Sequence, residues 1–280
     1  MPIIVRIVFP DIRYLNDKRE HMNRIDFTVE QAQVTGYLHE DYHHLVEHKI
    51  RPAMVICPGG GYAFTCPRES DPPALQFFAD GFQVFILHYS VGREAVGLRP
   101  LRALALTVKT IRDHCEEWHS DPEKIAVMGF SAGAHLAACL GTLYERSSYV
   151  RYENSAPNAL ILAYPVITMG EYTHASTALI VSGGDAALKE VLSVEKQVGP
   201  QMPPTFVWHT VDDRSVPVEN SILLISALQK NNIPFECHLF QNGKHGLSTC
   251  TQEVETPDPA CHEWLKLAKN WLYRLFDYRC

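Results

Sequence analysis

The stretch Met128-Gly129-Phe130-Ser131-Ala132-Gly133-Ala134-His135 (MGFSAGAH) places a serine between two glycines, in the pattern G-x-S-x-G. The apolar run KIAVMGF (124–130) predicts a strand that ends at Ser131, and GAHLAACLGTLY (133–144) predicts a helix directly after it. A serine on such a sharp turn has a strained backbone, and small neighbours let the strand and the helix pass close to each other. We therefore predict that Ser131 is a nucleophile. The alternative is an incidental serine at a glycine-lined turn.

Similar apolar runs alternate with helical patterns along most of the chain. Strands are predicted for AMVIC (53–57), FQVFILHY (82–89), ALILAYP (159–165) and TFVWHT (205–210), and helices for 100–118, 218–230 and 262–276. Strands that are apolar at successive positions suit a parallel sheet that is covered on both faces. The segments IIVRIVF and QAQVTGYL, within the first fifty residues, instead predict antiparallel edge strands. We expect one α/β domain over residues 1–280, with a mostly parallel central sheet and helices on both faces.

Composition excludes several classes of function. The formal net charge is −7 and no run of Lys or Arg occurs, which argues against a partner such as nucleic acid. No uncharged apolar run approaches the length of a membrane span, and the start of the sequence does not resemble a signal peptide. The eight cysteines form no CxxC pair, and several lie in apolar patterns. We expect a cytoplasmic protein with no membrane partner.

Three further segments follow predicted strands and contain groups that a nucleophilic serine needs. CPGGGY (57–62) is a glycine-rich loop in which Gly60 or Gly61, together with Ala132, can offer N–H groups to an oxyanion. WHTVDDRSVPVENS (208–221) offers two adjacent carboxylates, either of which can orient a histidine. FQNGKHGLS (240–248) puts His245 in a loop after the last predicted strand. The chain order of serine, aspartate and histidine is the order of α/β-hydrolase enzymes.

A metal site has to be weighed as well, because HEDYHHLVEH (39–48) contains four histidines. Its first five residues, His39 to His43, match the zinc-protease pattern H-E-x-x-H, with Glu40 in the place of the general base. That pattern functions on a long amphipathic helix, whereas this segment is a short polar connection between two predicted strands. We predict a solvated connection and no metal ligands.

These motifs together resemble the α/β-hydrolase superfamily, and more narrowly its small carboxylesterase branch, which includes bacterial acetylxylan-esterase-like and lipase/esterase proteins. The matching segments lie between about residues 53 and 250 in the family's order. They are ICPGGGY with the nearby Arg68-Glu69, EEWHSDPEKIAVMGFSAGAHLAA, YPVITMGEY, PPTFVWHTVDDRSVPVENS and GKHGLS. The family's aspartate lies three residues before the valine of a Val-Pro pair, which here selects Asp213 over Asp212. The family often has a glycine where this chain has Ala134.

The resemblance implies a catalytic triad of Ser131, Asp213 and His245, and an oxyanion hole formed by Gly60 or Gly61 with Ala132. It implies hydrolysis of short-chain acyl esters, with acetyl groups on a sugar as one candidate, and no metal or organic cofactor. An amide or thioester hydrolase with the same triad and a binding scaffold without activity are the alternatives. The stretch 166–203 is too short for a large mobile lid and predicts a small cap-like insertion. The sequence leaves open the oligomeric state and the roles of Arg68, Glu69 and His174.

Overall fold

The computed structural model describes residues 13–15, 22–40, 49–146, 148–150 and 152–279. Its centre is a nine-stranded sheet in the order β1-β2-β3-β5-β4-β6-β7-β8-β9. The strands are β1 (Arg13–Leu15), β2 (Met22–Val29), β3 (Ala32–His39), β4 (Arg51–Cys57), β5 (Gln83–His88), β6 (Ser120–Phe130), β7 (Ala159–Ala163), β8 (Thr205–Thr210) and β9 (Phe235–Phe240). The pairs from β1 to β5 are antiparallel, and all pairs from β5 through β9 are parallel.

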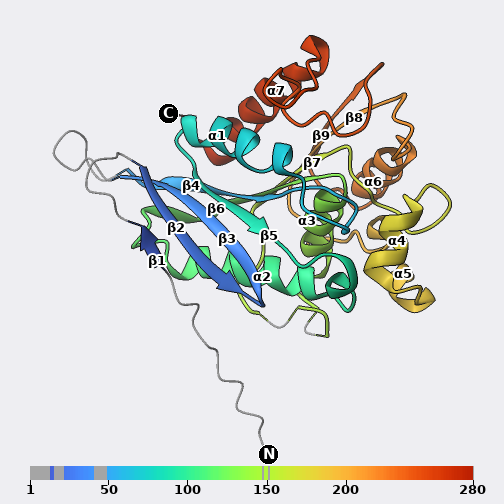
Figure 1. Cartoon of the computed structure of the whole chain (residues 1–280), viewed down its shortest axis with the longest axis horizontal. Coiled ribbons are helices and arrows are strands. Elements are labelled where there is room, and N and C mark those ends of the chain that lie inside the picture. Colours follow the sequence, from blue (N-terminus) through green and yellow to red (C-terminus); the bar gives the residue numbers. More distant parts are fainter. Residues whose placement is uncertain (1–12, 16–21, 41–48, 147, 151, 280) are drawn as a thin grey trace, which may run out of the picture.

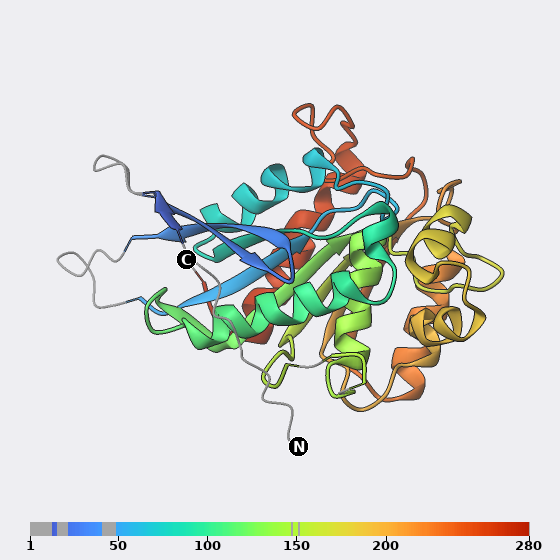
Figure 2. The ribbon, with the colours of Figure 1, turned by 60° about the horizontal axis from the view of Figure 1, so that its bottom comes forward.

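Helices cover both faces of this sheet, as Figures 1 and 2 show. The α-helices are α1 (Asp71–Ala79), α2 (Arg99–Asp113), α3 (Ala132–Leu143), α4 (Ala175–Ser182), α5 (Ala186–Leu192), α6 (Glu219–Lys230) and α7 (Pro259–Phe276). Short 3₁₀ helices are η1 (Pro67–Glu69), η2 (Gly92–Ala95) and η3 (Val194–Lys196). The buried side chains of α1 and α7 belong to the hydrophobic core on one face of the sheet. Those of α2, α3 and α6 belong to the core on the other face.

The central strands are apolar throughout because both of their faces are buried. In β4, Val55 and Cys57 belong to the core under α2 and α3, whereas Met54 and Ile56 belong to the core under α1 and α7. Successive side chains of a strand point to opposite faces, so a strand covered on both sides has no polar alternation. The prediction of a mostly parallel α/β sheet with antiparallel strands at its N-terminal edge is confirmed.

The described N-terminal edge of the sheet consists of β1, β2 and β3, and β3 covers most of the predicted strand QAQVTGYL. The segment 3–9, for which we predicted a strand, lies outside the described residues, so that strand stays a prediction. In β2, Ile25 and Phe27 face the core while Arg24 and Asp26 are more exposed, so this strand alternates as an antiparallel strand with one covered face does. None of the described helices combines the length and apolar character that a membrane-crossing segment requires.

The sheet brings together the segments that the sequence singled out. Loops leave the carboxyl ends of β4, β6, β8 and β9, and these loops contain Gly59–Gly61, Ser131, Asp213 and His245 respectively. Parallel neighbours end at one edge, so residues that are far apart in the sequence converge there. This edge is the candidate site.

Candidate functional site

Ser131 lies on a strained turn between β6 and α3. Its φ and ψ are 52° and −115°, a conformation that residues with a side chain rarely adopt. The two flanking glycines make the turn possible. A Cβ atom on Gly129 would lie 2.2 Å from the carbonyl oxygen of Gly133, and one on Gly133 would lie 2.0 Å from that of Cys57. Both positions therefore require glycine, and the backbone places the Ser131 side chain at the sheet edge.

The hydroxyl of Ser131 is hydrogen-bonded to His245, which in turn is hydrogen-bonded to Asp213. The distance from His245 Nε2 to Ser131 Oγ is 2.8 Å, and the distance from His245 Nδ1 to Asp213 Oδ2 is 2.6 Å. A proton on Nδ1 is donated to the carboxylate, so Nε2 is left as an acceptor for the serine hydroxyl. The side chain of Asp213 is fully buried and that of His245 is 21% exposed. The three side chains thus form one hydrogen-bonded chain, from the buried Asp213 through the partly exposed His245 to Ser131. This chain is called the relay below.

Four hydrogen bonds fix the carboxylate of Asp213. The N–H groups of Ser215 and Val216 donate to Oδ1 at 2.9 and 3.0 Å, and His245 shares Oδ2 with a second, fully buried histidine, His209. His209 Nε2 lies 3.3 Å from Oδ2 and 3.0 Å from the carbonyl oxygen of Val216. Burial alone would raise the pKa of Asp213, but hydrogen bonds from His209 and His245 outweigh it and hold the pKa well below its usual range. The carboxylate is therefore ionised and oriented.

The neighbouring Asp212 has a different contact. Its Oδ1 accepts the N–H of Gly243 at 2.7 Å, which ties the loop after β8 to the loop that contains His245. Sequence reasoning from the residues alone left both aspartates open, and the structure separates them by contact. Sequence reasoning also missed His209, although the sequence contains a signal for it. A histidine inside the otherwise apolar strand TFVWHT requires buried hydrogen-bond partners.

The glycine-rich loop after β4 packs against Ser131. Gly60 and Gly61 have φ values of 122° and 63°, and a Cβ on Gly59 would lie 3.1 Å from Ser131 Cβ. In the described part of the chain, no acceptor is hydrogen-bonded to the N–H groups of Gly60, Gly61 or Ala132. Ala132 is the first residue of α3, where N–H groups have no partner within the helix. The loop and the helix start therefore offer free donors beside Ser131.

A buried histidine, His135, supports this loop from beneath. It accepts a hydrogen bond from the Tyr62 hydroxyl at Nδ1 (2.9 Å), and its Nε2–H donates to the carbonyl oxygen of Leu192 (2.8 Å). Tyr62 follows Gly61 directly, and its hydroxyl contact reaches one turn into α3. Complete burial lowers the pKa of His135 from 6.5 to about 4. His135 is thus a neutral structural group that joins the glycine loop, α3 and the segment before β8.

This pKa predicts a loss of stability in mild acid. Below pH 6.5 the unfolded chain takes up a proton at His135, whereas the folded chain does so only near pH 4. The free energy of unfolding should therefore fall as the pH falls across this interval, by about 3 kcal/mol from this residue. Urea denaturation at several pH values should give a shallower pH dependence for His135→Gln than for the wild type. Equal slopes would show that His135 does not contribute.

Residues 166–203 lie between β7 and β8 and contain α4, α5 and η3. His174 immediately precedes α4, and its Cε1 would lie 3.8 Å from a Cβ on Gly61. Its Nδ1 is 2.8 Å from the hydroxyl of Thr177, and burial lowers its pKa. The start of α4 therefore covers the glycine loop and borders the site.

Of the histidines in HEDYHHLVEH, His39 lies in the described part of the chain. Residues 41–48 lie outside the described part, and His39 stacks on Phe78 with ring centroids 3.9 Å apart. His39 Nε2 is also 2.9 Å from the carbonyl oxygen of Phe78, so its contacts are structural. Within the described ranges, no group of three or more His, Cys, Asp or Glu side chains is placed to hold a metal ion.

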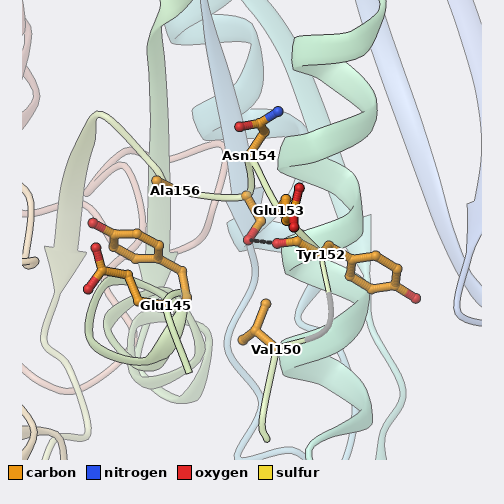
Figure 3. A pocket seen from close by; sticks show the side chains of 8 residues that line it. Glu145, Val150, Tyr152, Glu153, Asn154 and Ala156 are labelled. Atoms are coloured by element: carbon orange, nitrogen blue, oxygen red, sulfur yellow. Dashed lines mark hydrogen bonds between the residues drawn. The ribbon is translucent and has the colours of Figure 1, made fainter. Parts of the chain in front are cut away.

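A separate hollow of about 640 Å³ lies in the loop region after α3 (Figure 3). It is lined by Tyr144, Glu145, Val150 and residues 152–156. Helix α3 has 12 residues and starts next to Ser131, so its far end is about 18 Å from the serine. This hollow does not belong to the site around Ser131.

Comparison with known proteins agrees with this architecture. The BD-FAE family model matches residues 42–228, which is more than half of the chain. The chain belongs to the BD-FAE family. Among curated proteins, this BD-FAE chain is 33% identical over 256 residues to the endo-1,4-β-xylanase B of Butyrivibrio fibrisolvens; the match covers 87% of the chain. It spans only 39% of the length of that relative.

Two solved structures resemble this BD-FAE protein over nearly their whole length. One is an acetyl ester-xyloside bifunctional hydrolase from Caldicellulosiruptor lactoaceticus, with 32% identity, a TM-score of 0.78 and 89% of each chain covered. The other is an α/β hydrolase enzyme from a Medee basin deep-sea metagenome library, with 33% identity and a TM-score of 0.79. That match covers 93% of this chain and 100% of the other. The fold is therefore that of the α/β hydrolases.

Proposed function

We propose that this chain is a serine carboxylesterase that cleaves short-chain acyl esters, acetyl esters of carbohydrates in particular. The observation that supports it most is the relay of Ser131, His245 and Asp213, with contacts of 2.8 and 2.6 Å. The relay lies at the carboxyl edge of the sheet, beside N–H donors for which the described residues provide no acceptor. A hydroxyl, a base, an orienting carboxylate and a donor pair are the groups that acyl transfer from an ester requires.

The proposed reaction has two steps. His245 Nε2 removes the proton of Ser131 as Oγ attacks the ester carbonyl, and the imidazolium is stabilised by the buried carboxylate of Asp213. The same imidazolium then protonates the leaving alcohol, which leaves an acyl group on Ser131. Water, deprotonated by His245, attacks this acyl-enzyme, and His245 returns that proton to Ser131 Oγ as the acid is released. No atom outside the chain, the ester and water is needed for this balance.

The negative oxygen of each tetrahedral intermediate would lie between the glycine loop and the start of α3. Gly60 or Gly61 supplies one N–H and Ala132, the first residue of α3, supplies the other. One such donor lowers the barrier by about 2.7–4 kcal/mol in comparable enzymes. The strained φ of Ser131 is the conformational cost of this arrangement.

The proposed substrate class follows from the relatives and from the cap. A relative of nearly equal length is described as acting on acetyl esters and xylosides, and the longer curated relative is a xylanase. Residues 166–203 bring His174 to the border of the site, and we propose that this segment is a small cap within a single domain. A small-molecule ester, with an acetylated sugar as the favoured case, is the proposed partner.

A substrate panel tests this proposal. We expect hydrolysis of p-nitrophenyl acetate and release of acetate from acetylated xylo-oligosaccharides. From acetate to octanoate, kcat/KM should fall by about tenfold or more, because a pocket fitted to a small acyl group excludes extra methylenes. Matched amide and thioester substrates are the comparison. Faster cleavage of the amide or thioester, or no ester hydrolysis by folded protein, would contradict the proposal.

A further inference from the structure

A buried carboxylate outside the relay contacts the glycine loop. Glu69, at the end of η1, is only 3% exposed, and its Oε2 accepts the N–H of Gly59 at 2.8 Å. Gly59 lies between Glu69 and Ser131. A Cβ added to Gly59 would lie 2.5 Å from Glu69 Oε2 and 3.1 Å from Ser131 Cβ. Glu69 thus determines where the glycine loop lies relative to the nucleophile.

The second oxygen of Glu69 connects to the loop that contains His245. Its Oε1 accepts the hydroxyl hydrogen of Tyr164 at 2.7 Å, and the same hydroxyl oxygen accepts the N–H of Ser248 at 2.9 Å. The ring of Tyr164 also packs edge to face on the ring of His245, with centroids 5.0 Å apart. One carboxylate therefore connects both loops that flank Ser131.

The hydrogen bonds also indicate which protonation state fits. Both Glu69 oxygens face donors, and Tyr164 can donate to only one acceptor, so the ionised carboxylate satisfies every partner. Burial raises the pKa of Glu69, which means that burial opposes this ionised form. A glutamine of the same shape can accept at one end only, and its amide hydrogens then face a donor at the other end.

We propose that Glu69 is a positioning residue for acyl transfer, which fixes the glycine loop and the His245 loop relative to each other and to Ser131. This inference rests on the proposed esterase function. It gives a role to a residue that the sequence left open. Glu69 has no contact with the reacting atoms; it acts through Gly59 on one side and through Tyr164 on the other.

The test is the variant Glu69→Gln, with Glu195→Gln as the matched control. Glu195 is half-buried, and burial raises its pKa as it raises that of Glu69. It lies in η3, however, and its carboxylate is hydrogen-bonded to the side chain of Thr168. We expect kcat for p-nitrophenyl acetate to fall about 10- to 100-fold in Glu69→Gln, less than for loss of an oxyanion donor, with KM within about threefold. The control should keep wild-type kcat.

A second readout separates positioning from folding. Phenylboronic acid forms a tetrahedral adduct on a nucleophilic serine and places an oxygen where the oxyanion would lie. Its affinity should fall in parallel with kcat in Glu69→Gln while the melting temperature stays within a few degrees. Unchanged kcat, or a loss of kcat with unchanged boronate affinity, in folded Glu69→Gln would overturn the inference.

Tyr164→Phe provides an independent variant because it removes only the hydroxyl and leaves the ring against His245. We expect a lower kcat in Tyr164→Phe, and a double variant whose loss is smaller than the product of the two single losses. Should Glu69→Gln fail to fold, unchanged kcat in Tyr164→Phe would overturn the inference by itself. Absence of any ester hydrolysis by the wild type would instead overturn the proposed function.

Discussion

Replacing Ser131 with alanine is expected to lower kcat for p-nitrophenyl acetate about a million-fold, to the rate that binding and the proposed oxyanion donors alone support. Among the described residues, the Ser131 hydroxyl is the group hydrogen-bonded to His245 Nε2, at 2.8 Å, so its loss removes the proposed nucleophile. Removal of one oxygen from a turn fixed by Gly129 and Gly133 leaves the fold intact. Labelling by a fluorophosphonate probe should disappear together with the activity.

A second buried serine offers a matched control for this experiment. Ser155 is 1% exposed, and its hydroxyl donates to the carbonyl oxygen of Tyr152, in the loop between α3 and β7. Ser155→Ala should keep wild-type labelling and activity. Labelling that persists in Ser131→Ala would show that another residue is the nucleophile. Absence of labelling in folded wild-type protein would contradict the acyl-enzyme itself.

The turn at Ser131 was predictable because its requirements are local. A strand, a turn and a helix follow one another within MGFSAGAH, and the need for glycine at positions 129 and 133 is set by neighbours in the sequence and by β4. The buried parallel strands were predictable for a similar reason, since continuous apolar runs indicate cover on both faces. From these two features we predicted a sheet at whose carboxyl edge the loops after β4, β6, β8 and β9 meet.

Contacts between distant segments were not predictable in the same way. Glu69 and Tyr164 are separated by 95 residues, and they meet only because β7 and the loop after β4 end at the same sheet edge. His209 was placed in a strand, but its partner Asp213 is fixed by a turn whose backbone conformation the residue types leave open. The direction of each aspartate in the Asp212-Asp213 pair depends on the same turn.

The Asp212-Asp213 pair gives the second large expected loss of kcat. We expect Asp213→Asn to lower kcat about 10⁴-fold, because asparagine has one acceptor oxygen where Asp213 has two. If that oxygen accepts the backbone N–H groups of Ser215 and Val216, the NH₂ group faces His245 Nδ1 and cannot accept its proton. His245 would then turn to the tautomer with hydrogen on Nε2, which faces Ser131 and cannot take its proton. The pH–rate profile of p-nitrophenyl acetate hydrolysis, with circular dichroism to verify folding, is the measurement.

Asp212→Asn is the control, because it makes the same chemical change one residue away. The contact of Asp212 is the N–H of Gly243, and an asparagine oxygen accepts that hydrogen bond equally well. Its kcat should therefore stay within about threefold of the wild type, since a neutral amide still fixes the loop. Equal losses in both variants, or a larger loss at Asp212, would mean that the carboxylate opposite His245 during catalysis is not Asp213. The 2.6 Å contact would then belong to a resting arrangement that the reaction leaves.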